Sequence, residues 1–300
     1  MTAHLLRRTG QALLVLWAAF TAAYLLLQAM PGDAVLIKFQ NPELGLSPER
    51  IAEIRSYYDG GGYLHTLLGF LQGDFGYSVE TGTPVLDRLA EGLPATAELA
   101  GAAFALAVPL AVLIAFASCH STRLRGLLLA VPSLMVSVPV FLLGILLVQL
   151  FSFRLGLVPV IGGSRAQQLV LPVLTLAVPV SAPIAQVLAR ALDHALAQPY
   201  VPVVAAKGAS RSRILWRHAA RNALPPALTV AGLTFGELVA GSVVTETVFG
   251  RNGVGRLTEQ AVDSQDTPVL LAVVVLAAAV FVLVNLLVDV LFPILDPRLA

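Results

Sequence analysis

The chain has 300 residues, of which 57% are hydrophobic and 12% are charged, and its mean hydropathy is +0.82. These values exclude an ordinary soluble globular protein and indicate an all-α integral membrane protein with several spans. The formal net charge of +1 gives no reason to expect a nucleic-acid partner, and the single cysteine, Cys119, excludes an intrachain disulfide. No cluster of Cys and His has the spacing of a zinc site, so no metal site is expected.

Six apolar runs are long enough to cross a membrane, because a bilayer core about 30 Å thick requires about 20 residues of helix. The six predicted spans cover residues 10–30, 96–118, 126–151, 169–189, 224–245 and 268–292. Pro31 follows the first run where a signal peptide would need small residues, so we predict an uncleaved span there.

The distribution of Lys and Arg predicts the orientation of these spans. With the N-terminus in the cytoplasm, the inner segments contain most of the basic residues of the chain. These are Arg7, Arg8, Arg123, Arg125, Arg190, Lys207, Arg211, Arg213, Arg217, Arg221 and Arg298. Most of the acids fall in the outer segments. The positive-inside rule therefore predicts a multi-pass membrane protein with both termini in the cytoplasm.

The spans divide the chain into three predicted parts. Residues 1–30 form the N-terminus and first span, residues 31–94 an extracytoplasmic region, and residues 95–300 a five-helix core with a cytoplasmic loop at 191–223. In the outer region, the stretch SPERIAEIRSYY (47–58) begins with an N-cap candidate and a proline, which predicts a short amphipathic helix. So long a connection indicates a functional segment, here a lid or docking surface.

A basic stretch, AAKGASRSRILWRHAARNALPP (205–226), separates the fourth and fifth spans. No helix breaker occurs between Ser210 and Pro225, and Gly208 suits the left-handed end of a preceding helix. We therefore predict a helix, a glycine turn and a second helix at the cytoplasmic surface. One interpretation is a juxtamembrane segment that only contacts anionic lipid.

The order of residues in this stretch favours a second interpretation. It resembles the cytoplasmic "EAA" loop of binding-protein-dependent ABC importer permeases of the dipeptide, oligopeptide and nickel branch. The matching residues are Tyr200, Ala206, Lys207, Gly208, Ser210, Arg213, His218, Ala219, Arg221, Asn222 and Ala223. Further stretches resemble the same family in the same order, namely MPGDA (30–34), GDFGYSV (73–79), LPATAEL (93–99), VTETVFGRNGVGRL (244–257) and VNLLVDVLFPILDPRL (284–299).

Three positions depart from the pattern of the branch. Pro202 and Ala205 stand where arginines are usual, which predicts a less charged first arm of the loop, broken near Pro202. Asn252 stands where the family has proline.

The resemblance implies the fold of a type I ABC importer permease with six spans and a cytoplasmic coupling helix. It also implies three kinds of partner besides membrane lipids: a second permease subunit, two P-loop ATPase subunits and an extracytoplasmic binding protein. ATP and Mg would be bound by the ATPases, so no cofactor is expected in this chain. The predicted ATPase-coupling residues are Ala206, Lys207, Gly208, Ser210, Arg213, Ile214, Leu215, Trp216, His218, Arg221 and Asn222.

Within that loop, Ile214, Leu215 and Trp216 form a predicted apolar patch that would anchor an ATPase subunit. Arg211, Arg213 and Arg217 would form its polar rim. The chain contains no G-x-x-x-x-G-K-[ST] phosphate loop and no recognised catalytic motif, so a non-catalytic subunit is expected.

Glu237 is the one acid near the middle of a predicted span. It is expected either to be hydrogen-bonded within the helix bundle or to line the translocation path. Thr245, Glu246 and Asn285 are further candidates for the path. For Thr245 and Glu246 the alternative is a solvated helix end, and for Asn285 it is a hydrogen bond between helices.

The expected cargo is short peptides delivered by the binding protein. Uptake of nickel or haem is the alternative within the branch. Outside it, the alternatives are a secondary transporter driven by an ion gradient, which usually needs intramembrane acids as ion relays, and a membrane scaffold.

Overall fold

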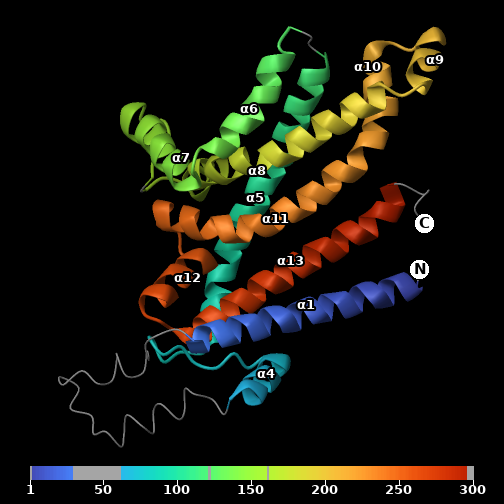
Figure 1. Cartoon of the computed structure of the whole chain (residues 1–300). Coiled ribbons are helices and arrows are strands. Elements are labelled where there is room, and N and C mark those ends of the chain that lie inside the picture. The colour runs from blue at the N-terminus through green and yellow to red at the C-terminus, as the bar shows by residue number, and fades with distance from the viewer. Residues whose placement is uncertain (1, 30–61, 121–122, 161, 296–300) are drawn as a thin grey trace, which may run out of the picture. The chain divides into compact units, whose positions relative to one another are not determined.

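A computed structural model describes residues 2–29, 62–120, 123–160 and 162–295. Helices dominate these residues, and no strand occurs among them beyond an isolated bridge between Tyr77 and Pro84 (Figure 1). The elements are α1 (Thr2–Ala29), α4 (Tyr63–Gln72), α5 (Val85–His120), α6 (Arg125–Ser137), α7 (Val140–Leu147), η2 (Val148–Arg154), α8 (Arg165–Leu196), α9 (Tyr200–Ala206), α10 (Arg211–Arg213), η3 (Ile214–Ala219), α11 (Ala220–Phe249), α12 (Val254–Asp263) and α13 (Thr267–Leu295). Both η segments are π-helical. The all-α class is confirmed, whereas the predicted helix at 47–58 lies outside the described residues.

Four described helices, α1, α5, α8 and α13, are each long and apolar enough to cross a membrane. Two bent helix pairs, α6 with α7–η2 and the two parts of the Arg211–Phe249 stretch, raise the number of spans to six when each pair counts as one. Six spans agree with the sequence prediction.

The predicted span at 126–151 is not one straight helix. It bends by 99° between α6 and α7 (Figure 1). Val138 is extended, with ψ of 121°, and Pro139 follows it as the N-cap of α7. Proline disfavours the helical conformation in the residue before it and donates no backbone hydrogen bond, so the helix stops at Ser137 and starts again in a new direction.

The chain divides into two compact units. Unit 1 contains residues 1–97 and 250–282, and unit 2 contains residues 98–249 and 283–300. Helices α5 and α13 therefore contribute residues to both units.

In unit 1, α1 and α13 lie side by side, with Phe20 and Ala23 of α1 buried against Leu271 of α13 (Figure 1). An aromatic cluster fixes α4 to α1, because the ring of Phe20 lies 5.7 Å from that of Tyr63 and 5.2 Å from that of Phe70. Tilted and edge-to-face ring pairs at such distances add to the stabilisation that burial provides.

Helix α5 begins at Val85, well before the predicted start at residue 96. Val85 and Leu89 are buried in one cluster with Val254, Leu257 and Val269 of α12 and α13. The early start therefore has a packing cause that lies far away in the sequence, and a search for apolar runs misses it.

A buried carboxylate holds the segment 73–84 to the start of α13. Ser78 donates its hydroxyl to Asp266 Oδ2 at 2.5 Å, and the backbone N–H groups of Val79 and Glu80 donate to the same carboxylate at 3.2 and 3.3 Å. Ser78 and Asp266 are fully buried. We call this arrangement the Asp266 joint. Burying a carboxylate is tolerable here because donors of the chain replace water around its oxygens.

The core of unit 2 is built from small side chains at helical spacing. Ala103, Ala107, Ala111 and Ala115 of α5 are completely buried, four residues apart along one face. They belong to clusters that α8 and α11 complete, among them Ala177 and Leu188 of α8 and Ala223, Ala231 and Leu238 of α11. Small residues allow helices to approach closely, as in other membrane helix bundles.

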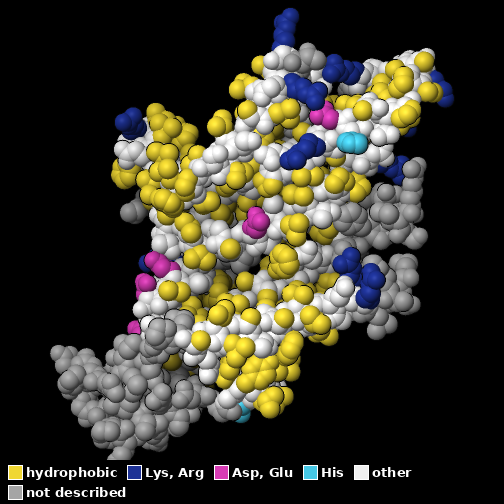
Figure 2. All heavy atoms as spheres, in the orientation of Figure 1, with side chains coloured by type: hydrophobic (Ala, Val, Ile, Leu, Met, Phe, Trp, Pro, Cys, Tyr) yellow, Lys and Arg dark blue, Asp and Glu magenta, His cyan; other side chains and the backbone are white. Residues whose placement is uncertain are grey.

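Large apolar side chains remain exposed on the outside of the helices, where they cover much of the visible surface (Figure 2). Leu13 and Leu14 of α1, Leu134 of α6 and Leu283 of α13 are each about 60% exposed, between 58% and 64%. Apolar surface on this scale is unusual for a protein in water and is what a lipid-facing surface requires.

Candidate functional site

The segment between α8 and α11, which we call the basic loop (residues 197–223), has the predicted order of helix, glycine turn and helix. Helix α9 ends at Ala206, Gly208 has φ of 83°, and α10 begins at Arg211. The Ser210 side chain accepts a hydrogen bond from the Arg213 N–H at 3.3 Å and so caps the second helix. Figure 1 shows α9 and α10 at one end of α8 and α11.

Gly208 is required by its backbone conformation rather than by crowding. A Cβ atom at this position would meet nothing within 4 Å. The left-handed conformation costs residues with a Cβ about 1–2 kcal/mol. Gly208 N–H donates to Ala205 O and Ala209 N–H donates to Val204 O, so the turn also satisfies the last carbonyls of α9.

The expected break of the first arm near Pro202 is wrong by a few residues. Helix α8 ends at Leu196 and α9 begins at Tyr200, with Pro199 as its N-cap, so the break lies before Pro202. Pro202 falls in the first turn of α9, where a backbone N–H would have no partner within the helix and proline is tolerated.

The predicted apolar patch needs correction, because only one of its three residues is at the surface. Ile214 and Leu215 are 6% and 4% exposed, and Leu215 packs in one cluster with Leu188 and Leu192 of α8. These two side chains attach the loop to its own chain and cannot also anchor a partner. Trp216 is 59% exposed.

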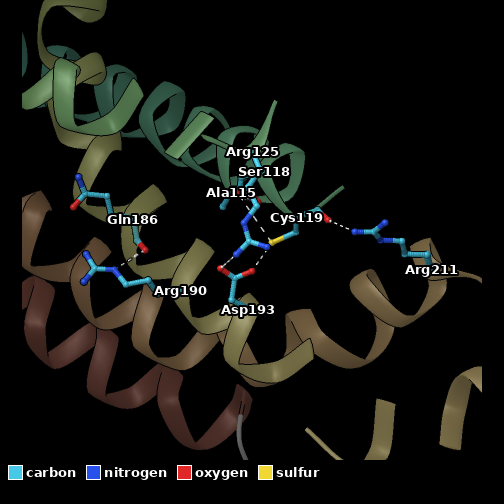
Figure 3. Close-up of polar contacts among 8 residues, drawn as sticks. All are labelled: Ala115, Ser118, Cys119, Arg125, Gln186, Arg190, Asp193 and Arg211. Atoms are coloured by element: carbon cyan, nitrogen blue, oxygen red, sulfur yellow. Dashed lines mark hydrogen bonds and ion pairs between the residues drawn. The ribbon is translucent and has the colours of Figure 1, made fainter. Parts of the chain in front are cut away.

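Trp216 lies against α5. Its ring stacks on the Phe116 ring with centroids 4.0 Å apart and planes 24° from parallel. Nearby, Arg211 Nη2 donates a hydrogen bond of 2.9 Å to the backbone oxygen of Cys119, close to the end of α5 (Figure 3). A cation is favourable there because the last carbonyls of a helix carry partial negative charge. The basic loop is therefore held to α5 by one stacked ring pair and one charged hydrogen bond.

A third group of contacts ties α5 and α6 to α8. Asp193 of α8 lies between Arg125 and the Cys119 thiol (Figure 3). Arg125 Nη2 is 2.7 Å from Asp193 Oδ2, and the Cys119 thiol donates to Asp193 Oδ1 at 3.8 Å. The three helix ends next to the basic loop are thus linked through one carboxylate.

A cavity of about 1050 Å³ opens between α8 and the second arm of the loop. Cationic and imidazole side chains line it from both sides, namely Arg190, His194, Arg217, His218 and Arg221. Asn222 at its rim donates to the Tyr200 hydroxyl at 3.3 Å, which links the two arms of the loop. Most of the predicted coupling residues are exposed, namely Ala206, Lys207, Gly208, Ser210, Arg213, Trp216, Arg221 and Asn222, whereas His218 is half-buried and Ile214 and Leu215 are buried.

Glu237 is exposed on α11, and no hydrogen-bonding or ion-pairing partner is found for it among the described residues. The expected alternative of a carboxyl bonded within its own helix bundle is therefore not seen in this part of the chain. Thr229, Leu233, Ala240 and Val244 are exposed with it at steps of three or four residues. Together they form one face of α11, which we call the Glu237 face.

The other three candidates for the path lie elsewhere. Thr245 and Glu246 are completely buried, and the Thr245 hydroxyl donates to Gly241 O at 3.1 Å. The alternative of a solvated helix end is thus wrong for both. Asn285 is half-buried on α13. The structure does not bring these residues onto the Glu237 face.

Sequence reasoning missed the residues that hold the site in place. Phe116, Asp193 and Arg125 carry no local signal, because each matters only through a contact with a distant segment. The only hint in the sequence was that one acid near the end of a predicted span, Asp193, could pair with a basic residue at the start of a neighbouring span.

The model of the family described as "Binding-protein-dependent transport system inner membrane component" matches residues 107–300. The chain belongs to this family, and it is a multi-pass permease component of an ABC importer rather than a catalytic subunit. This confirms the resemblance that the basic loop indicated.

Full-length relatives agree with this assignment. The chain is 34% identical to a probable peptide ABC transporter permease of Sinorhizobium fredii, covering 100% of the chain and 99% of the relative. It is 35% identical to a putative peptide transport system permease of Brucella abortus, over 99% of each. It is also 34% identical to a glutathione transport system permease of Salmonella typhimurium, over 89% of the chain and 85% of that protein.

Among solved structures, an inward-facing form of the MetNI methionine ABC transporter is similar in fold. The TM-score is 0.53 at 18% identity, over 67% of this chain and 95% of the other. The expected permease fold is thereby confirmed.

Proposed function

We propose that this chain translocates short peptides, delivered by an extracytoplasmic binding protein, at the expense of ATP hydrolysed by partner subunits. A second permease and two P-loop ATPases would complete the transporter. ATP and Mg would bind to the ATPases, and this chain would need no cofactor. The observation that carries the proposal is the basic loop, which has a cationic surface and one exposed tryptophan and is attached to the ends of α5 and α8.

The loop acts as a coupling element in this proposal. Lys207 and Arg213 provide exposed positive charge, and Trp216 provides an aromatic side chain of the kind that dominates interface energies. Leu215 is packed on α8, and Arg211 and Trp216 are attached to α5. Because of these contacts, a displacement of the loop by an ATPase would also move α5 and α8.

The proposed orientation places the basic loop and both termini in the cytoplasm. Arg123 and Arg125 before α6, Arg190 near the end of α8 and the arginines of the loop then share one side of a prokaryotic plasma membrane. The segment 73–84 would lie on the opposite side, where the binding protein docks.

The Glu237 face is proposed to line the path. Placing a charge in the hydrocarbon centre costs about 2.5–3.5 kcal/mol on the insertion scale, so an exposed and unpaired carboxyl on a span is not expected to face lipid. A water-filled path beside the second permease would keep it hydrated. There it could accept a hydrogen bond from the ammonium group of a peptide. Thr245, Glu246 and Asn285 would support this path from within the bundle.

The first test is to purify the tagged chain from its own cells and to measure ATP hydrolysis with binding protein and peptide. Co-purified ATPases and hydrolysis that rises with both additions would support the proposal. A chain that moves solute on an ion gradient alone would contradict it. Nickel chelates and haem, offered in the same assay, test the competing cargoes.

The second test concerns Glu237. In Glu237→Gln, uptake of peptides with a free amino terminus should fall about ten-fold, because a hydrogen bond to a charged group contributes about 1.5–3 kcal/mol. Uptake of amino-terminally acetylated peptides should change little. Thr229→Val, on the same face, is the control. Equal loss for both peptide classes would remove the ammonium contact from the proposal.

A further inference from the structure

The cavity beside the basic loop brings like charges together without compensation. Arg190 and His194 lie four residues apart on α8, and Arg217 and Arg221 lie four residues apart on the second arm of the loop, and all four line the cavity. No Asp or Glu is among the lining residues. Arg217 and Arg221 are like charges at a spacing that destabilises a helix, and Arg190 brings a third guanidinium to the same space, an arrangement that is unfavourable unless an anion is bound there.

The arginines are also available to bind. No hydrogen-bonding or ion-pairing partner of Arg217 or Arg221 is found in the described chain, and both are exposed. Arg190 uses only its Nε, which donates to Gln186 O at 3.3 Å, so its two terminal nitrogens stay available (Figure 3). The nearest acid on α8, Asp193, is paired with Arg125. Guanidinium groups bind phosphate through two parallel hydrogen bonds, which suits several arginines around one space.

The sequence positions of the arginines that line the cavity indicate the source of the anion. Arg190 directly follows the apolar run 169–189 of α8, and Arg221 lies three residues before the apolar run 224–245 of α11. The cavity therefore lies where apolar spans give way to basic sequence. Its lining is apolar as well as basic, since Val187, Ala191 and Pro226 contribute to it. A free phosphate ion would gain nothing from contact with these apolar side chains, whereas a phospholipid has both a phosphate group and an apolar body.

We propose that this cavity binds the phosphate group of an anionic phospholipid, which bridges the end of α8 and the second arm of the basic loop. Basic pockets between membrane helices on the cytoplasmic side bind the headgroups of anionic lipids. The bound lipid offsets the positive charge of Arg190, Arg217 and Arg221 and holds the loop against α8. Lipid composition then influences how firmly the coupling loop is held, a role separate from contact with an ATPase.

The test uses the assembled transporter, purified in mild detergent and examined by native mass spectrometry for retained phosphatidylglycerol, cardiolipin and phosphatidylethanolamine. We expect wild type to retain the anionic lipids in preference. The variant Arg190→Gln/Arg217→Gln should bind them more weakly by about five-fold for each arginine replaced, because each basic residue near an anionic surface contributes about 1 kcal/mol. Arg213→Gln removes an exposed arginine of the same loop that does not line the cavity, so it should retain the lipid.

Three outcomes would overturn the proposal. The first is equal retention by wild type and the double variant, with both complexes intact. The second is displacement by inorganic phosphate without any preference for anionic lipid, which would mean that a soluble phosphate is the ligand. The third is loss of the ATPase subunits from the double variant while lipid stays bound, which would place the cavity in the ATPase contact. Because lipid is counted directly, a failure to transport peptide would leave this result unaffected.

Discussion

The segment 73–84 in unit 1 and the basic loop in unit 2 are both connections attached to neighbouring helices, but the attachments differ in kind. The first depends on one fully buried carboxylate, Asp266, which accepts hydrogen bonds from Ser78 and from two backbone N–H groups. The second combines buried Ile214 and Leu215 with a half-exposed ring stack. Removing one partner of a buried polar contact lowers the stability strongly, because the remaining groups stay buried without a partner. An attachment made of several weaker contacts loses less stability when any one of them is removed.

The largest expected effect is at the Asp266 joint. In Asp266→Ala the Ser78 hydroxyl and the N–H groups of Val79 and Glu80 lose their acceptor, at about 1–3 kcal/mol for each group that stays buried. We expect a loss of about 3 kcal/mol or more in the free energy of unfolding, measured by thermal unfolding in one detergent. Asp263→Ala replaces an exposed acid at the end of α12 and should have little effect. Equal effects of both variants would mean that the joint is not a principal support of unit 1.

The next effect is at Gly208, whose conformation the loop requires. Gly208→Val should cost about 1–2 kcal/mol through the left-handed backbone and lower peptide-stimulated ATP hydrolysis about five-fold or more. Gly208→Asn is the matched control, because asparagine adopts this conformation more readily. If the Asn variant were as poor as the Val variant, contact with a partner rather than backbone conformation would be the reason for glycine here.

A smaller effect is expected for the stack of Trp216 on Phe116. A double-mutant cycle with Trp216→Ala and Phe116→Ala should give a coupling free energy of about 0.5–1.5 kcal/mol in thermal unfolding. The control cycle combines Trp216→Ala with Phe104→Ala, since Phe104 contacts Phe235 edge to face instead. Additive effects within the first cycle would show that the two rings do not support each other.

The smallest effect is expected for the ion pair of Arg125 with Asp193, whose side chains are 48% and 34% exposed. Arg125→Gln should lower the free energy of unfolding by less than about 1 kcal/mol, and raising the salt concentration should reduce the difference further. Arg123→Gln is the comparison in the same short connection. A loss that salt does not change would mean that Asp193 depends on Arg125 for more than charge.

Features that depend on neighbouring residues were predictable from the sequence, and features that depend on distant ones were not. The six apolar runs, the Gly208 turn and the family-like loop all have local signals. The 99° bend at Pro139 was not predicted, because proline within a membrane helix is compatible with both a mild kink and a sharp turn. The burial of Ile214 and Leu215 depends on α8, and that of Ser78 depends on Asp266.

The candidate path residues were found from the sequence, but their exposure could not be predicted from it. A mid-span acid at 237 was evident from the sequence, but its exposure depends on which face of α11 packs against α8. Thr245 and Glu246, four or five residues beyond Gly241, fall on the packed face and are completely buried. The face of α11 on which a residue falls therefore decides whether a ligand can reach it.

The stack on Phe116 also gives the protein an optical reporter of its own. The chain has two tryptophans, Trp17 in α1 and Trp216 in the basic loop. Replacing Trp17 with phenylalanine would leave a single indole, positioned on the surface that we propose for ATPase contact. Its emission maximum and its quenching by iodide would then follow the arrival of a partner at the loop in real time, without any attached dye.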